Sequence, residues 1–254
     1  MDAKDRTALV TGGAHRVGRA IALALARAGA NVVINYHTSE QAAQATAEEA
    51  RALGVEALPF GADVADLAQV EAMVAAAHRQ FGGVDILVNA ASCFEKTPVP
   101  TPDLGSWQRV TRTLIDGAFY CANAVAPLML ARGEGAIVNI VDLAVWTPWP
   151  DFAAHSVGKA ALMALTRQLA LELAPAVRVN AVAPGPVLPP PHFTEQQTRH
   201  AAERTLLRRW GTPEDVTQAV LFLIGAGYIT GQVIVVDGGE SIAGGVRGRR
   251  AEGG

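Results

Sequence analysis

The sequence has few cysteines, little net charge and no long apolar run, and each shortage excludes a class of protein. Its two cysteines, Cys93 and Cys121, show no pairing pattern, which indicates a reducing compartment without disulfides. The net charge of −3 gives no reason to expect a nucleic acid or an anionic membrane as a partner. No apolar stretch reaches the roughly 18 residues of a membrane span, and the short polar N-terminus shows no signal peptide. We therefore expect a cytoplasmic protein.

What the sequence does contain is a regular alternation of strand and helix signals. The 254 residues suffice for one large α/β domain, and half of them are apolar. The alternation predicts a Rossmann-type, doubly wound, seven-stranded parallel sheet with helices on both faces. We expect this single domain over residues 1–240 and a flexible tail over residues 241–254. Expected strands lie at about 8–11, 31–35, 55–60, 84–89, 136–141, 177–182 and 232–236, and expected helices at about 16–27, 39–53, 66–80, 106–129, 152–173 and 213–224.

The most informative stretch of the sequence is Thr7 to Ala28, which is expected to form the first strand, a turn and the first helix. A buried strand leads into the glycine turn Gly12-Gly13 and then into an amphipathic helix. Glycine allows positive φ and lets a phosphate approach the main chain closely. The helix start then offers unpaired N–H groups and the positive end of its dipole to an anion. Because strands one and four meet at the switch point of such a sheet, the stretch predicts a dinucleotide site there.

Five motifs resemble those of the short-chain dehydrogenase/reductase family, and together they span residues 7–239. They are TGGAHRVG at 11–18, LVN at 87–89, the helix that carries Lys159, RVNAVAPGPV at 178–187, and ITGQVIVVDGG at 229–239. Within the family, three details resemble the pteridine reductases. Arg16 replaces the usual glycine, Tyr36-His37 follows the second strand, and Asp142 replaces the usual serine after the fifth strand.

The region after the second strand favours NADP(H) over NADH. An NAD enzyme usually places an acidic residue there for the ribose 2′-hydroxyl, but residues 35–39 contain no carboxylate. Arg16, His37, Thr38 and Ser39 would instead donate to a 2′-phosphate. The pteridine reductases usually have a basic residue where Thr38 stands, so use of both cofactors stays open. We predict no metal site.

The resemblance implies a role for each further cofactor position. Asp63 and Val64 would contact the adenine, Asn89 and Ala90 the ribose, and Ser92 the phosphates or the nicotinamide. Pro184, Gly185 and Val187 would frame the nicotinamide, and Lys159 would hold its ribose. The complete predicted cofactor set is Thr11, Gly12, Arg16, Val17, Gly18, Tyr36, His37, Thr38, Ser39, Asp63, Val64, Asn89, Ala90, Ser92, Lys159, Pro184, Gly185 and Val187.

The resemblance also exposes two departures at catalytic positions. The family supplies a proton from a tyrosine four residues before the lysine, and this chain has His155 there. The family usually has an asparagine that kinks the long helix and holds a relay water, and this chain has Leu114. The spacing places His155 and Lys159 on a common helix face. We therefore predict Asp142, His155 and Lys159 as the catalytic residues.

Three functions remain open from the sequence. The chain reduces a substrate with His155 or Asp142 as the acid, since histidine is a competent donor near neutral pH. Alternatively, it performs non-hydride chemistry with His155 as base and Asp142 orienting it. The third alternative is binding of NADP(H) without turnover.

The substrate predicted by resemblance is a flat heterocycle such as a dihydropterin or dihydrofolate, with a cyclic imine or small ketone as the alternative. Phe94 matches the aromatic residue that stacks the pterin in pteridine reductases. Trp146, Trp149, Leu188 and His192 would line the same pocket. The family usually pairs its long helices into homotetramers, with a homodimer as the alternative, and the faces expected to do so carry Ala118, Ala122, Val125, Ala160, Met163 and Leu169.

Overall fold

A seven-stranded parallel sheet forms the centre of the protein. The computed structural model describes residues 1–190 and 193–243. The strand order is β3-β2-β1-β4-β5-β6-β7, and every neighbouring pair is parallel. The strands are β1 (Thr7–Thr11), β2 (Asn31–Tyr36), β3 (Ala57–Gly61), β4 (Ile86–Asn89), β5 (Gly135–Ile140), β6 (Val177–Pro184) and β7 (Val233–Val236). The predicted fold class is confirmed, with strand ends that differ by one or two residues from the expected ones.

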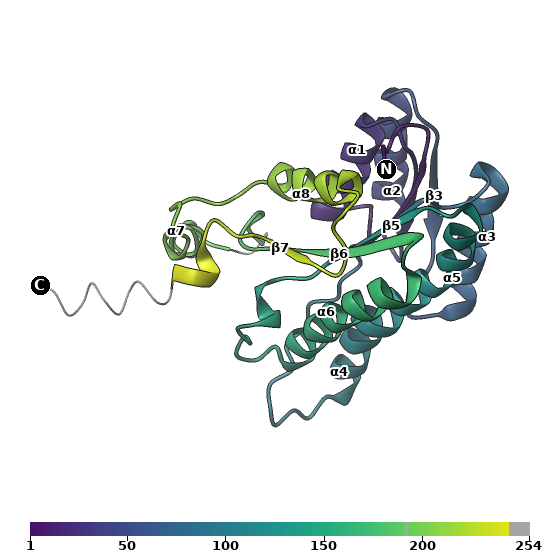
Figure 1. Cartoon of the computed structure of the whole chain (residues 1–254). Coiled ribbons are helices and arrows are strands. Elements are labelled where there is room, and N and C mark those ends of the chain that lie inside the picture. The colour runs from purple at the N-terminus through teal and green to yellow at the C-terminus, as the bar shows by residue number, and fades with distance from the viewer. Residues whose placement is uncertain (191–192, 244–254) are drawn as a thin grey trace, which may run out of the picture.

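Helices cover both faces of this sheet, as Figure 1 shows. On one face, α1 (Arg16–Arg27), α2 (Glu40–Ala52) and α8 (Pro213–Gly225) bury a core that includes Ile21 and Val220. On the other, α3 (Leu67–Phe81), α5 (Gly117–Arg132) and α6 (Ala153–Leu173) bury a second core around Met73 and Met129. Two further helices, α4 (Leu104–Thr111) and α7 (Glu195–Arg204), lie outside these layers. Because both faces are buried, the inner strands are continuous apolar runs.

The sheet reverses its winding at β1, which pairs with both β2 and β4. Thr11 at the end of β1 lies opposite Asn89 at the end of β4. The Thr11 hydroxyl accepts hydrogen bonds from the N–H groups of Ala90 and Ala91, each at 3.0 Å. The carboxyl ends of the two strands are therefore tied together at the switch point, where this class of fold binds ligands.

The helix expected over residues 106–129 is longer in the structure and is interrupted by a π-helical turn. It runs from Leu104 to Arg132, and a π-helical turn at Arg112–Asp116 separates α4 from α5. By length and composition alone, this stretch would suffice to cross a membrane. Its buried residues, such as Val125, instead pack in the core under the sheet, as in a core helix of a soluble protein.

Two smaller expectations, the Ser39 cap and the flexible tail over residues 241–254, differ in part from the structure. Ser39 precedes α2 as predicted, but its side chain makes no capping hydrogen bond. Residues 240–243 of the chain end are helical, and Asp237 accepts from the N–H groups of Gly239 and Ser241. The rest of the predicted tail, residues 244–254, lies outside the described residues.

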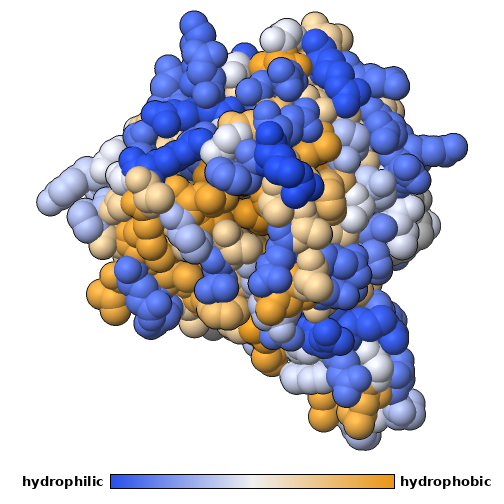
Figure 2. Space-filling model, turned by 90° about the vertical axis from the view of Figure 1, so that its right-hand side faces the viewer, coloured by the Kyte–Doolittle hydropathy of each residue, from blue (hydrophilic) through white to orange (hydrophobic). Residues whose placement is uncertain are grey.

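Four of the six side chains expected to pair subunits are buried within the chain itself, while Ala160 and Met163 of α6 are half-buried. Ala118, Ala122 and Val125 are at most 5% exposed and belong to the chain's own core, as does Leu169. The exposed apolar side chains of α5 and α6 are others: Phe119, Leu130, Val157 and Leu171. Figure 2 shows the side of the molecule that carries α3 and α5, and apolar side chains gather in part of it.

Candidate active site

The glycine turn after β1 has the geometry of a phosphate cradle. Gly12 has φ +61°, and a Cβ there would lie 2.9 Å from Ala91 Cα. A Cβ on Gly18 would lie only 2.2 Å from the Gly12 carbonyl oxygen. His15 precedes α1 without a side-chain cap, and the first turn of α1 has no acidic residue. The first N–H groups of α1 are thus open to an anion, and the turn fits the pyrophosphate of a dinucleotide.

The carboxyl end of β2 presents only neutral or basic side chains. Asn35 is buried, and its Oδ1 accepts from the Gly12 N–H at 3.2 Å, so β2 also supports the glycine turn. His37 and Thr38 are exposed and Ser39 is half-buried, which leaves them free to meet a ligand. This arrangement lacks the carboxylate that would repel a 2′-phosphate.

Arg16 occupies a conformation normally left to glycine and reaches across the site. Its φ is +50°, in the left-handed region. The guanidinium donates to the carbonyl oxygens of Leu188 at 2.8 Å and Pro189 at 3.4 Å. Arg16 therefore holds the loop after β6, and it would have to leave these carbonyls to bind a phosphate. His15, which is also exposed, is a basic neighbour in this turn that the sequence analysis passed over.

The remaining predicted cofactor positions differ in exposure. Val64 packs against Gly117 of α5, and Val187 packs in the core that α8 covers. A Cβ on Gly61 would meet the Tyr36 ring at 3.1 Å, so these two residues fix β2 against β3. Val64, Asn89 and Val187 are buried, Ser92 is exposed, and Val17, Tyr36, Asp63, Ala90, Pro184 and Gly185 are half-buried.

Asp142, His155 and Lys159 come together at the carboxyl end of β5. Nε2 of His155 lies 2.6 Å from Oδ2 of Asp142. Lys159, one turn further along α6, donates from Nζ to the Ile140 carbonyl oxygen at 2.7 Å. His155 and Lys159 are 3% and 4% exposed, so both face inward as the helical spacing predicts. The Asp142 carboxylate is more accessible, with 16% of its side chain exposed.

Charge and burial set the protonation of this group. Burial favours the neutral form of Asp142, but the hydrogen bond from His155, the Lys159 charge and the Ala144 N–H outweigh it and lower the pKa. Burial also lowers the pKa of Lys159, and the nearby Asp142 charge opposes that shift. An ionised Asp142 therefore supports both the lysine and the imidazole.

Two aromatic rings cover the imidazole of His155. The Trp149 ring stacks on it, with 5.5 Å between centroids and 13° between planes. The Phe94 ring meets it edge-on at 4.8 Å and 83°. Phe94 itself stacks on Phe152 at 4.4 Å and remains 56% exposed. The structure thus brings Phe94 and Trp149, both predicted to line the substrate pocket, directly against His155, which is predicted to be catalytic.

A strap formed by residues 93–99 holds Phe94 in place. It is bridged to the start of α6 by a parallel pairing of Thr97 with Phe152. Glu95 accepts from Arg109 of α4 at 2.8 Å and 3.1 Å, and these bonds are the main cause that lowers the pKa of Glu95 to about 2. Both of these anchors, Glu95 and Thr97, follow Phe94 in the chain and hold the strap against α4 and the start of α6.

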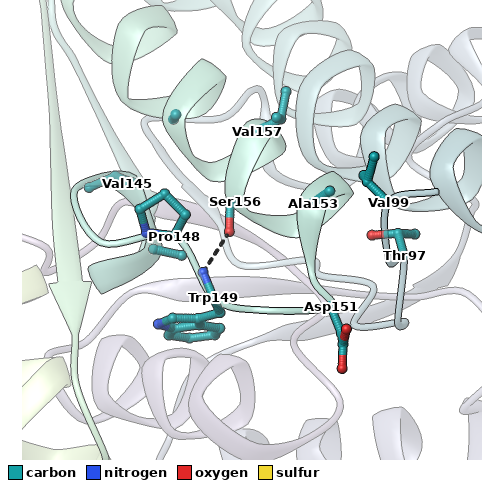
Figure 3. A pocket seen from close by; sticks show the side chains of 11 residues that line it. Thr97, Val99, Val145, Pro148, Trp149, Asp151, Ala153, Ser156 and Val157 are labelled. Atoms are coloured by element: carbon teal, nitrogen blue, oxygen red, sulfur yellow. Dashed lines mark hydrogen bonds between the residues drawn. The ribbon is translucent and has the colours of Figure 1, made fainter. Parts of the chain in front are cut away.

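A groove of about 470 Å³ lies on the outer side of α6 (Figure 3). The Ser156 hydroxyl accepts from the Trp149 main-chain N–H at 3.3 Å and so fixes the loop between groove and imidazole. The groove residues of α6 lie on the side opposite His155 and Lys159, because successive helical residues turn by 100°. It is lined by Thr97, Val99, Ala144, Val145, Pro148, Trp149, Asp151, Ala153, Ser156, Val157 and Ala160.

Known proteins match this chain over nearly their whole length. A family model described as enoyl-(acyl carrier protein) reductase matches residues 12–241. The chain is 39% identical to a 3-oxoacyl-[acyl-carrier-protein] reductase of Synechocystis sp., over 92% of this chain and 96% of that protein. It is 36% identical to 3beta-hydroxysteroid dehydrogenase 1 of Eggerthella lenta, over 95% of each. A solved protein described as a putative short-chain alcohol dehydrogenase, from Sinorhizobium meliloti, superposes with TM-score 0.88 at 34% identity, covering 93% of this chain and 96% of that chain.

The chain belongs to the short-chain dehydrogenase/reductase family. It is an oxidoreductase scaffold of that family in fold and sequence, as predicted. The closer resemblance to pteridine reductases stays a prediction, since the relatives named above carry other names. The expected site residues likewise stay predictions, now with the geometry described above.

Leu114 changes how this short-chain dehydrogenase/reductase packs its site. The π-helical turn at Arg112–Asp116 is present without the usual asparagine. Leu114 is 1% exposed, and a Cβ on Gly158 of α6 would lie 2.7 Å from its Cδ1. An aliphatic side chain thus fills the space between α6 and η1, the π-helical turn. The polar side chain that contacts the His155 imidazole is Asp142.

A buried polar ladder that the sequence analysis missed connects the sheet with α6. Asn89 Nδ2 donates to Asn139 Oδ1, and Asn139 Nδ2 donates to the Thr166 hydroxyl, each at 2.9 Å. Thr166 in turn donates to the Leu162 carbonyl at 2.8 Å. The ladder fixes α6, and so the catalytic pair, against the ends of β4 and β5. A buried asparagine inside a strand pattern was the available signal.

The other predicted substrate residues are less directly placed. Trp146 is 48% exposed on the loop that also carries Trp149. Leu188 is half-buried, and its carbonyl accepts from Arg16. His192 lies outside the described residues.

Proposed function

We propose that the chain is an NADP(H)-dependent reductase in which the His155–Asp142 pair replaces the usual tyrosine as the proton-handling group. The substrates we propose are a ketone, a cyclic imine or a pterin-like heterocycle. The 2.6 Å contact between His155 and Asp142, one helical turn from buried Lys159, carries this proposal. Reduction of C=O or C=N needs a proton at the atom next to the one that receives hydride.

Each residue of the pair contributes a separate part of the proton transfer. His155 holds and releases the proton, and the Asp142 carboxylate orients the imidazole and stabilises its charged form. Lys159 donates to the Ile140 carbonyl oxygen beside this pair and, by family resemblance, would bind the nicotinamide ribose. The bound nicotinamide would supply the hydride. A lysine buried without a role would be costly, which favours retained activity over simple cofactor binding.

The cofactor proposal depends on the two ends of the dinucleotide cleft. The glycine turn and the open N-terminus of α1 suit a pyrophosphate. The neutral and basic side chains after β2 suit the 2′-phosphate of NADP(H), with His15, His37 and Thr38 exposed there. Arg16 would join them once it leaves the loop carbonyls.

The substrate proposal combines the aromatic walls with the names of the relatives. Phe94 offers an exposed ring beside His155, which suits a flat or apolar substrate. The relatives are named for 3-oxoacyl and hydroxysteroid substrates, and so favour the ketone over the heterocycle. We propose a cytoplasmic homotetramer, or a homodimer, with the exposed apolar residues of α5 and α6 as contacts.

The same contact also supports a second function. An aspartate that orients a histidine is the arrangement of general-base enzymes that transfer no hydride. In that case the chain would bind the dinucleotide and still perform acid–base chemistry on another substrate. An inactive, cofactor-binding protein is the third alternative.

Fluorescence titration with NADPH and NADH, followed by absorbance assays, separates these functions. We expect tighter binding of NADPH than of NADH, and oxidation of NADPH with at least one of a panel of ketones, cyclic imines and dihydrobiopterin. Binding without oxidation across the panel would contradict the reductase proposal and favour the second or third function. Equal affinity for both cofactors would contradict the 2′-phosphate assignment.

A further inference from the structure

The contacts of Asp142 fix which nitrogen of His155 carries a proton. The carboxylate accepts from the Ala144 N–H through Oδ1 at 2.9 Å and faces His155 Nε2 through Oδ2 at 2.6 Å. Its lowered pKa keeps it ionised, and an ionised carboxylate can only accept hydrogen bonds. Nε2 is therefore the protonated nitrogen, and in the neutral imidazole Nδ1 carries a free lone pair.

Nδ1 is buried and has no hydrogen-bond partner among the described residues. A buried polar atom without a partner costs about 1–3 kcal/mol, so its retention in a catalytic cluster indicates a ligand. The ring that carries it is bounded by the Trp149 face and the Phe94 edge. A ligand that binds Nδ1 must therefore carry a hydrogen-bond donor on an apolar or aromatic molecule.

We propose that Nδ1 of His155 is the atom that exchanges the proton with the substrate, and that it binds the hydroxyl of a secondary alcohol. The inference rests on the proposed function and adds the reacting atom: an alcohol substrate would give its hydroxyl proton to Nδ1. A tyrosine oxygen can donate and accept at one atom, whereas here Nε2 is committed to Asp142. Only Nδ1 remains for the substrate.

The proposed step balances as follows. The hydroxyl proton moves to Nδ1, and the hydrogen on the carbinol carbon leaves with its electron pair to an oxidised nicotinamide dinucleotide. The C–O single bond becomes a C=O bond, and the imidazolium that forms is stabilised by Asp142. Nδ1 then releases the proton to water. Ketone reduction is the reverse and requires that Nδ1 first be protonated.

The charged groups around the imidazole define the expected pH dependence. Asp142 and Lys159 are the titratable neighbours, from the loop after β5 and from α6, and the lowered pKa of Asp142 keeps that carboxylate ionised. On the strap, Glu95 is bound by Arg109, and burial raises the pKa of Cys93 to about 11, so this thiol is neutral. Oxidation takes up the hydroxyl proton and needs a bare Nδ1, whereas reduction needs a protonated Nδ1, so we expect oxidation to be faster at high pH and reduction to be faster at low pH.

Nitrogen NMR of the ligand-free protein tests the protonation pattern without any turnover. In protein labelled with ¹⁵N-histidine, the signals lost in His155→Gln identify the ring. In the neutral imidazole we expect a protonated Nε2 and a bare Nδ1. In Asp142→Asn the side-chain oxygen keeps the Ala144 N–H, and the amide nitrogen then donates to Nε2, so the proton should move to Nδ1. A bare Nε2 in the wild type would overturn the inference.

Kinetics with NADP⁺ and secondary alcohols, and with NADPH and the matching ketones, test the direction. From about pH 5 to about pH 9, we expect oxidation to rise and reduction to fall. Asp142→Asn should slow oxidation by at least about 100-fold, with unchanged affinity for NADP⁺. Asp151→Asn, which removes a carboxylate from the groove on the outer side of α6, is the matched control and should change neither.

The outcomes separate the two proposals. Turnover whose two directions share one pH profile would overturn the inference and leave the proposed function in place. Binding of NADP(H) with no turnover of alcohol or ketone at any pH would overturn the proposed function, and the inference with it.

Discussion

Replacing Gly18 by alanine tests the phosphate cradle at its closest contact. The added Cβ would lie 2.2 Å from the Gly12 carbonyl oxygen and 2.9 Å from its carbonyl carbon. Both atoms are main chain, so the start of α1 must move away from the turn. Overpacking typically costs about 1–3 kcal/mol, and this rigid contact belongs at the upper end. The alanine regains about 1 kcal/mol of helix propensity, which leaves about 2 kcal/mol of destabilisation.

The same displacement should weaken cofactor binding. If the phosphates lose one or two charge-assisted hydrogen bonds, each worth about 1.5–3 kcal/mol, the affinity for NADPH falls at least about tenfold. Urea unfolding measures the first effect, and fluorescence titration measures the second. Gly225→Ala is the matched control, because nothing lies within 4 Å of its Cβ and it too is helical. A Gly18→Ala protein with wild-type stability and affinity would refute the cradle.

Three further predictions concern single side chains. Arg16→Ala should speed hydrogen exchange in the loop that carries Leu188, because the guanidinium of Arg16 binds the carbonyl oxygens of that loop. Arg19→Ala, which removes a cation from the same helix, should not. Equal effects of the two substitutions would contradict the claim that Arg16 holds the loop. Leu114→Asn restores the family residue but should cost about 2–4 kcal/mol in urea unfolding, because Leu114 fills a tight contact with α6; a neutral result would contradict that packing. Folding lowers the pKa of Asp142, so its carboxylate stabilises the folded protein at pH values above the unfolded pKa of about 3.9. That stabilisation is lost as the pH falls below this value. The difference in unfolding free energy between wild type and Asp142→Asn should therefore shrink below about pH 4. A gap that stays constant there would argue against an ionised Asp142.

Local patterns were enough to predict the sheet, the glycine turn and the inward face of α6 that carries His155 and Lys159. Strand and helix periods and glycine chemistry act over a few residues, and the four-residue spacing alone places His155 beside Lys159. The pair with Asp142 followed because the carboxyl end of β5 faces the same cleft.

The features that were missed depend on distant contacts or on the hydrogen-bond register. Arg16 meets carbonyls 172 and 173 residues away, which no local pattern signals. The π-helical turn shifts main-chain bonds without a change in composition. The faces of α5 were misassigned because that helix is apolar nearly all round, so periodicity does not tell its core side, with Ala122, from its exposed side, with Phe119.

The most direct measurement compares wild type with His155→Ala on an accepted substrate at saturating NADP(H). The account predicts at least about a 100-fold lower kcat in the variant, since general acid–base catalysis contributes about 10²–10⁴-fold. The affinity for NADPH should be unchanged, because His155 contacts Asp142 and aromatic rings rather than the phosphate cradle. A variant that turns over at the wild-type rate would contradict the central claim that this imidazole handles the proton.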